Sequence, residues 1–223
     1  MSGPHVKICG LKDAESAIAA ARAGADYLGF VFFRKSPRFI TPEGAEEIIL
    51  DLKQAAFDEG FNLPRLVGLF VDAGEKELSE AAPLLSHFQF HGHESAERCE
   101  ELGLEFGVEV IKAIPVTDAA DIAKAKEFEE AADILLFDAK PPPGAGRPGG
   151  NGVSFDWTLL SAYAGETPYI VAGGLMPENV AAAVKGHAGR ETFLGVDVSS
   201  GVESAPGEKD EDLIKAFISA AKA

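Results

Sequence analysis

The chain of 223 residues is 46% hydrophobic and 25% charged, which is typical of a globular protein and excludes a disordered or collagen-like one. It contains 20 lysines and arginines and 36 aspartates and glutamates, so the formal net charge is −16. Such an acidic surface repels phosphate backbones and anionic lipid headgroups. We therefore expect neither a nucleic-acid partner nor a membrane partner.

The expected location is the cytoplasm. No stretch of the sequence approaches the roughly 18 consecutive apolar residues of a membrane-spanning helix, and the first five residues lack the basic region and apolar core of a signal peptide. The two cysteines, Cys9 and Cys99, form neither a metal-binding spacing nor a disulfide framework, as expected for a reducing compartment.

Short apolar runs, rich in β-branched and aromatic residues, alternate with segments of helical spacing along the chain. Many runs are apolar on both faces, which is typical of parallel strands that helices cover. The predicted strands are His5–Cys9, Tyr27–Phe32, Arg65–Val71, His87–Phe90, Val108–Ile114, Asp133–Asp138, Tyr169–Ala172 and Phe193–Val198.

Two of the remaining segments carry clear helix signals. Thr41 and Pro42 supply an N-cap and a proline at the first helical position. The apolar residues at helical spacing are Ile48, Ile49, Leu52 and Ala56 in this segment, and Leu213, Ile214, Phe217, Ile218 and Ala221 in the last one.

About eight strand–helix units in this length predict a single-domain α/β fold over residues 1–223, the (β/α)8 or TIM barrel. An open doubly wound sheet is the alternative, but it usually has fewer strands and a glycine fingerprint after the first, where this chain has Cys9-Gly10-Leu11. No linker divides the chain. The proline- and glycine-rich stretch 140–152 is interpreted as a functional loop, with a flexible connector as the alternative.

Reactive side chains recur where the predicted strands end, which in this fold is the rim of the active-site pocket. Cys9 shares a strand face with Lys7, whose ammonium would favour the thiolate over the buried, inert thiol that is the usual state of a free cysteine. Asp138 closes an apolar run and needs a partner or a function, the alternative being a contact with its own loop. A cysteine and an aspartate across one barrel suit acid–base chemistry on a small molecule.

Two further features indicate a ligand with two anionic groups. The turns at Gly173-Gly174 and Ser199-Ser200 follow the last two strands, where backbone N–H groups of this fold hold phosphate, although plain tight turns are the alternative. Arg38 lies in a basic loop of an acidic chain and fits a carboxylate, a solvated loop being the alternative.

The motif His91-Gly92-His93 alternates like a pair of metal ligands. Because no further ligand follows at a convincing spacing, we expect no metal site.

Taken in order, these motifs resemble the phosphoribosylanthranilate isomerase family along nearly the whole chain. The matching segments are Lys7-Ile8-Cys9-Gly10-Leu11, Gly29-Phe30-Val31-Phe32, Lys35-Ser36-Pro37-Arg38, Phe90-His91-Gly92, Asp138, Gly149–Gly152 with Phe155-Asp156-Trp157, Gly173-Gly174-Leu175 with Pro177–Val180, and Asp197–Glu203.

The resemblance implies an Amadori rearrangement of N-(5-phosphoribosyl)anthranilate in tryptophan biosynthesis, without a cofactor. It implies that Cys9 is the general base and Asp138 the general acid. The substrate-binding residues would then be Arg38, His91 and Asp197, and the phosphate-binding residues Gly173, Gly174, Ser199 and Ser200.

Three alternatives remain open from the sequence. The related sugar isomerisation of histidine biosynthesis, or a bifunctional enzyme, is disfavoured because those relatives carry an aspartate where Cys9 stands and need a second phosphate site. A non-catalytic sensor of phosphorylated ligands is disfavoured by the joint presence of Cys9, Asp138 and Arg38. Monomer and homodimer are equally compatible with the sequence.

Overall fold

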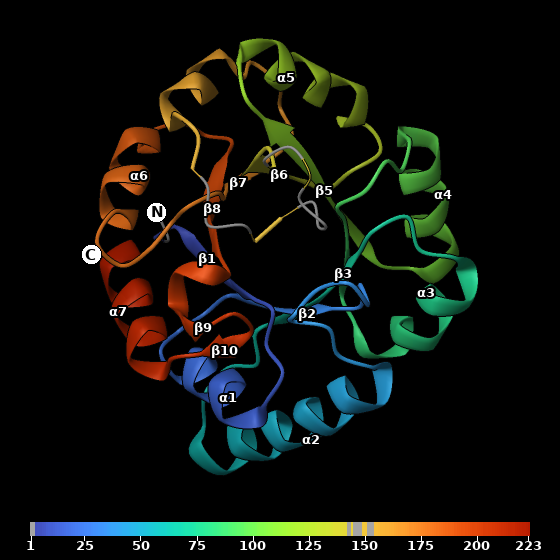
Figure 1. Cartoon of the computed structure of the whole chain (residues 1–223), viewed down its shortest axis with the longest axis vertical. Coiled ribbons are helices and arrows are strands. Elements are labelled where there is room, and N and C mark those ends of the chain that lie inside the picture. Colours follow the sequence, from blue (N-terminus) through green and yellow to red (C-terminus); the bar gives the residue numbers. More distant parts are fainter. Residues whose placement is uncertain (1–2, 142–143, 145–148, 151–153) are drawn as a thin grey trace.

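A computed structural model describes residues 3–141, 144, 149–150 and 154–223 and shows a closed parallel barrel with helices on its outside (Figure 1). The predicted fold class, a (β/α)8 barrel, is therefore confirmed. The barrel strands, hydrogen-bonded in chain order, are β1 (His5–Cys9), β2 (Tyr27–Val31), β3 (Arg65–Phe70), β4 (His87–Phe90), β5 (Glu109–Val116), β6 (Ile134–Ala139), β7 (Tyr169–Val171) and β8 (Phe193–Val198).

The predicted strand ends agree with these bounds to within two residues, and β5 differs most. The predicted strand ends before Pro115, but β5 continues to Val116 because Pro115 and Val116 both pair with β6. The last registered pair between β5 and β4 is Phe90 with Lys112, so Pro115 and Val116 have no register partner in β4. A proline at such an edge removes no bond from the sheet ladder.

The predicted helix after β2 is confirmed: it begins at Pro42, and the Thr41 hydroxyl accepts the N–H of Gly44 at 3.1 Å. In the sixth unit the described residues form a 3₁₀ turn, Trp157–Ala162, in place of an α-helix. The α-helices are α1 (Ala14–Arg22), α2 (Pro42–Glu59), α3 (Glu75–Ala81), α4 (Ala96–Phe106), α5 (Ala119–Ala123), α6 (Val180–His187) and α7 (Glu211–Ala221).

Alternate residues of most barrel strands belong to two separate apolar clusters, whereas β1 and β4 contribute no residue to the smaller one. In β6, for example, Leu135 and Phe137 pack in the larger cluster with the helices, whereas Ile134 and Leu136 belong to the smaller one. Successive side chains of a strand point to opposite faces, so the smaller cluster fills the inside of the barrel. Asp138 continues the inward series and therefore stands above this packed interior.

A short hairpin of β9 (Glu203–Ala205) and β10 (Glu208–Lys209) follows β8 and precedes α7. Its turn lies against the loop after β2, because a Cβ on Gly207 would come within 2.5 Å of the Pro37 carbonyl oxygen. The hairpin therefore joins the loops of β2 and β8 at the rim of the barrel. Among the described residues, no helix has both the length and the apolar character needed to span a membrane.

Candidate active site

The thiol of Cys9 lies at the end of β1 and is buried, with 4% of the residue exposed. Gly29 on β2 makes room for it, because a Cβ there would come within 2.9 Å of Sγ. Lys7, two residues earlier, is fully buried, and its Nζ donates to Asp197 Oδ1 on β8 at 2.6 Å. Burial raises the pKa of the Cys9 thiol, while the Lys7 ammonium beside it acts in the opposite direction.

Lys7 stays protonated although it is fully buried. Burial by itself would lower the pKa of this ammonium, but the carboxylate of Asp197 and the neighbouring Cys9 outweigh it and raise the pKa. A buried cation next to a thiol stabilises the thiolate when the proton leaves. Lys7 therefore acts on Cys9 in the predicted direction, but burial outweighs it, so the net pKa of the thiol is raised.

Asp138 lies at the end of β6 with 9% of the residue exposed. Its Oδ1 accepts the N–H of Ala139 at 2.8 Å, which is the local contact considered as an alternative, and its Oδ2 lies 3.4 Å from Nε2 of His91. His91 in turn has Nδ1 3.3 Å from Nε2 of Gln89 on β4. The local bond occupies one carboxyl oxygen, and the other is directed toward His91.

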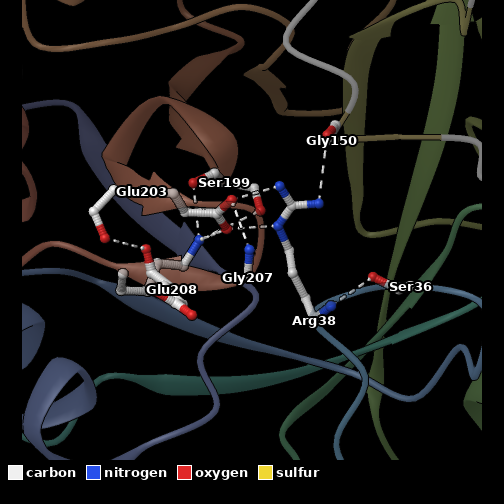
Figure 2. A network of polar contacts seen from close by, with 9 residues as sticks. Ser36, Arg38, Gly150, Ser199, Glu203, Gly207 and Glu208 are labelled. Carbon is white, nitrogen blue, oxygen red and sulfur yellow. Dashed lines mark hydrogen bonds and ion pairs between the residues drawn. The ribbon is translucent and has the colours of Figure 1, made fainter.

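Arg38 is 3% exposed, so the solvated loop considered for it is wrong. Its Nε and Nη2 donate to the two carboxylate oxygens of Glu203 at 2.6 and 2.8 Å, and Nη1 lies 3.4 Å from the Gly150 carbonyl oxygen (Figure 2). Burial would raise the pKa of Glu203, but the bonds from Arg38 and the charge of Lys209 outweigh it and lower the pKa. Glu203 is therefore an ionised partner at neutral pH.

These groups surround two adjoining cavities at the carboxyl ends of the strands. Both cavities are lined by Asp138, Gly150, Asp197 and Ser199, so they share a wall. The first is also lined by apolar side chains at the ends of β2 and β3 and just beyond them, together with Cys9, Ser36, Arg38, Gln89, His91 and Gly149. The second is also lined by Ala139, Gly173, Gly174, Leu175, Val198, Ser200 and Gly201.

Every predicted site residue lies on one of these cavities, and the division follows the predicted roles. The predicted catalytic and substrate-binding residues line the first cavity: Cys9, Arg38, His91, Asp138 and Asp197. The predicted phosphate-binding residues line the second: Gly173, Gly174, Ser199 and Ser200. Proximity does not test a role, so the individual roles stay predictions.

Other sequence features lie elsewhere or were not anticipated. His93 is exposed, pairs with Asp72 and is not among the residues that line the two cavities. No group of three or more histidines, cysteines and acids within the described ranges is placed to hold a metal ion. Sequence reasoning missed Gln89, Lys209 and the partnership of Arg38 with Glu203. Most of the predicted functional loop, 140–152, lies outside the described residues, and its Gly149 and Gly150 line the first cavity.

A buried thiol, a carboxyl group and two glycine- and serine-rich turns at the strand ends of a (β/α)8 barrel define an enzyme of this barrel class. The model of the N-(5'-phosphoribosyl)anthranilate (PRA) isomerase family matches residues 6–220. The chain belongs to this family.

Individual relatives agree over the full length. The N-(5'-phosphoribosyl)anthranilate isomerase of Rhodospirillum rubrum is 47% identical over 224 aligned positions, which cover 100% of this chain and 99% of that protein. The phosphoribosyl anthranilate isomerase of Thermotoga maritima superimposes with a TM-score of 0.80 at 35% identity, covering 100% and 99% of the two chains. A structure of phosphoribosyl anthranilate isomerase with reduced 1-(o-carboxyphenylamino)-1-deoxyribulose 5-phosphate superimposes with a TM-score of 0.77 at 34% identity, with the same coverage.

Proposed function

We propose that this chain isomerises N-(5-phosphoribosyl)anthranilate to 1-(2-carboxyphenylamino)-1-deoxyribulose 5-phosphate, a step of tryptophan biosynthesis. One observation carries the proposal: two cavities share a wall of Asp138, Asp197 and Ser199, with an arginine on the first and paired glycine and serine turns on the second. The substrate has a matching shape, with a carboxylate on an apolar ring at one end and a phosphate at the other.

The phosphate would bind in the second cavity. Gly173 and Gly174 have φ angles of +81° and +67°, a conformation that glycine adopts without strain and that turns successive N–H groups toward one side. The described lining of this cavity contains no lysine or arginine, so backbone N–H groups and the hydroxyls of Ser199 and Ser200 are the donors for the anion. Lys7 offsets the negative charge of Asp197 on the same wall.

The anthranilate ring would occupy the first cavity, where Val31, Leu69 and Val71 supply apolar contacts. Arg38 reaches this cavity as a charged donor for the ring carboxylate. His91 lies on the same lining and would contact the substrate between the ring and Asp138. The two anionic groups of the substrate would therefore be held at opposite ends, which positions the sugar at the shared wall.

The chemistry needs two proton transfers at the sugar. Asp138 would donate a proton to the ring oxygen of the ribose, so that the C1′–O bond breaks and a protonated Schiff base forms. The Cys9 thiolate would then remove the proton from C2′, giving an enolamine that tautomerises to the ketone. Positioned proton transfers of this kind each contribute about 10² to 10⁴ in rate. Asp197 would orient the sugar and hold Lys7 next to Cys9.

A direct assay tests the proposal. Phosphoribosylanthranilate, generated freshly from anthranilate and phosphoribosyl pyrophosphate by a coupling enzyme, is added to the protein, and the loss of anthranilate-type fluorescence is followed. We expect turnover that stops when the substrate is exhausted. Absence of turnover by protein whose circular dichroism shows it to be folded would overturn the proposal.

A further inference from the structure

The carboxylate of Glu203 occupies the centre of a buried network that sequence reasoning did not anticipate (Figure 2). Glu203 comes from β9, Lys209 from β10 and Arg38 from the loop after β2. Their side chains are 4%, 1% and 4% exposed. Lys209 Nζ donates to Glu203 Oε1 at 2.8 Å, and the N–H of Gly207 donates to Oε2 at 3.1 Å. The carboxylate of Glu203 therefore contacts two cationic side chains, Arg38 and Lys209, and the turn of its own hairpin.

The geometry of the Arg38–Glu203 contact determines which N–H groups remain for a ligand. A guanidinium has five N–H bonds, and Nε with one N–H of a terminal nitrogen forms its side fork. Glu203 takes this side fork with both oxygens. The second fork, at the end of the guanidinium, contains one N–H of each terminal nitrogen and is planar with the first. A carboxylate on the side fork therefore fixes the direction of the end fork.

Backbone contacts hold the stem of Arg38 in place, so the guanidinium at its end is the part whose direction a partner must set. Gly10 is the residue that follows β1. A Cβ on Gly10 would come within 2.5 Å of Arg38 Cδ, so the stem of the Arg38 side chain lies directly against it. Gly10 has a φ of +82°, which glycine adopts without strain. On the other side, Nη1 lies 3.4 Å from the Gly150 carbonyl oxygen. With its stem packed, the guanidinium depends on Glu203 for its orientation.

The same network reaches the other end of the site. Lys209 Nζ donates to the Ser199 carbonyl oxygen at 2.8 Å, and Ser199 lines both cavities. The chain of contacts from Arg38 through Glu203 and Lys209 to Ser199 therefore connects the two ends that the proposed function assigns to the carboxylate and the phosphate.

We propose that Glu203 is a positioning residue for substrate recognition. Its carboxylate accepts the hydrogen bonds of the side fork of Arg38 and thereby directs the end fork toward an aromatic carboxylate in the first cavity. The inference rests on the proposed function, because it assumes that Arg38 binds that carboxylate. Glu203 does not touch the substrate. Its effect on binding is exerted through Arg38.

A double-mutant cycle measures this dependence. The dissociation constant of reduced 1-(o-carboxyphenylamino)-1-deoxyribulose 5-phosphate is determined by titration calorimetry for the wild type, Arg38→Ala, Glu203→Gln and the double variant. We expect roughly 10- to 150-fold weaker binding in Arg38→Ala, which loses the charge-assisted contact, and about 10-fold weaker binding in Glu203→Gln, which loses only its orientation. In the Arg38→Ala background, the further change Glu203→Gln should cost less than about 2-fold, because the arginine it orients is gone.

Two more measurements separate positioning from general damage. Inorganic phosphate, which probes only the second cavity, should bind Glu203→Gln within about 2-fold of wild type, because the bond from Lys209 to the Ser199 carbonyl oxygen is separate from its bond to Glu203. KM should rise far more than kcat falls. Glu208→Gln, on the same hairpin but exposed, is the matched control and should change nothing. If Glu203→Gln does not fold, Glu203→Asp, which keeps the charge but shortens the side chain, takes its place in the cycle.

The outcomes are distinguishable. If Arg38→Ala binds the analogue as well as wild type, the proposed role of Arg38 fails. If Arg38→Ala is impaired but Glu203→Gln binds normally, or if the two losses multiply fully in the double variant, Arg38 keeps its role and the positioning role of Glu203 is overturned.

Discussion

Lys7 and Asp197 form a buried ion pair, 2.6 Å long, across the seam where β8 closes the barrel against β1. The two residues are direct partners in the strand register, so the pair lies inside the sheet seam itself. A buried pair of this kind contributes little compared with an apolar pair of the same size, but removing one partner leaves an uncompensated buried charge. The seam and the environment of Cys9 therefore depend on the same lysine.

Replacing Lys7 by methionine should destabilise the fold strongly. Asp197 would be left as a carboxylate with its partner removed, which typically costs about 3–5 kcal/mol. Urea unfolding followed by circular dichroism measures the loss as a lower midpoint. Lys53→Met on the exposed face of α2 is the matched control and should stay within about 0.5 kcal/mol of wild type. Equal midpoints for the two variants would show that the pair has no role in holding the seam.

Arg38→Ala should weaken binding of the anthranilate half of the substrate and spare the phosphate half. Loss of a charge-assisted bidentate contact typically costs about 1.5–3 kcal/mol, or roughly 10- to 150-fold in affinity. Inorganic phosphate should bind nearly as well as to wild type, because Arg38 does not line the second cavity. Titration calorimetry with both ligands checks this. An equal loss of phosphate affinity would show that Arg38 acts at the phosphate end of the site and not at the carboxylate end.

Cys9→Ser and Asp138→Asn should each lower kcat by at least about 10² and leave affinity for the reduced product analogue nearly unchanged. Serine keeps a small polar group whose proton is much harder to remove than that of a thiol, and asparagine keeps the shape of the carboxyl group without its acid. Steady-state kinetics and calorimetry on the same preparations give the two readings. Near-normal turnover in either variant would show that the residue is not the proposed general base (Cys9) or general acid (Asp138).

The pH dependence of kcat/KM gives an independent reading of Cys9. Because burial raises the pKa of this thiol, the thiolate forms only as the pH rises above the ordinary thiol range. The rising limb of the profile should therefore lie on the alkaline side of an ordinary thiol titration. In Lys7→Met the limb should move further in the same direction, since the opposing cation is lost. A rising limb at more acidic pH would show that another group is the base.

Acid should destabilise the protein through its buried histidines, of which His187 is the clearest. Burial, and to a lesser degree the nearby Arg190 guanidinium, lowers the pKa of His187 below the ordinary value of 6.5. The unfolded chain therefore binds the proton first. The stability due to neutral His187 is complete above that ordinary value and is lost as the pH falls toward the folded pKa.

Urea midpoints measured from about pH 7 to about pH 5 should fall, and His187→Gln should flatten this fall. His93→Gln is the control, because the side chain of His93 is 96% exposed and should leave the pH dependence as it is. Burial lowers the pKa of His5 and His87 as well, so part of the fall should remain in the His187 variant. A fall of wild-type size in His187→Gln would contradict this account.

Most of the fold could be predicted from the sequence, because its signals are local. A run such as Ile134–Phe137 is apolar on both faces, and Thr41 with Pro42 begins a helix whatever the rest of the chain does. Once eight parallel strands close, all their carboxyl ends meet at one rim, so residues at the predicted strand ends can be assigned to one site from the sequence alone. Cys9 and Asp138 are two such residues.

The partners of the buried charges could not be predicted, because they are set by contacts between distant parts of the chain. Glu203 lies 165 positions from Arg38, and Asp197 lies 190 positions from Lys7. Nothing in the sequence near Arg38 distinguishes a solvated arginine from a buried one. Only closure of β8 against β1, and the packing of the β9–β10 hairpin on the loop after β2, excludes water from these groups and makes an opposite charge necessary beside each of them.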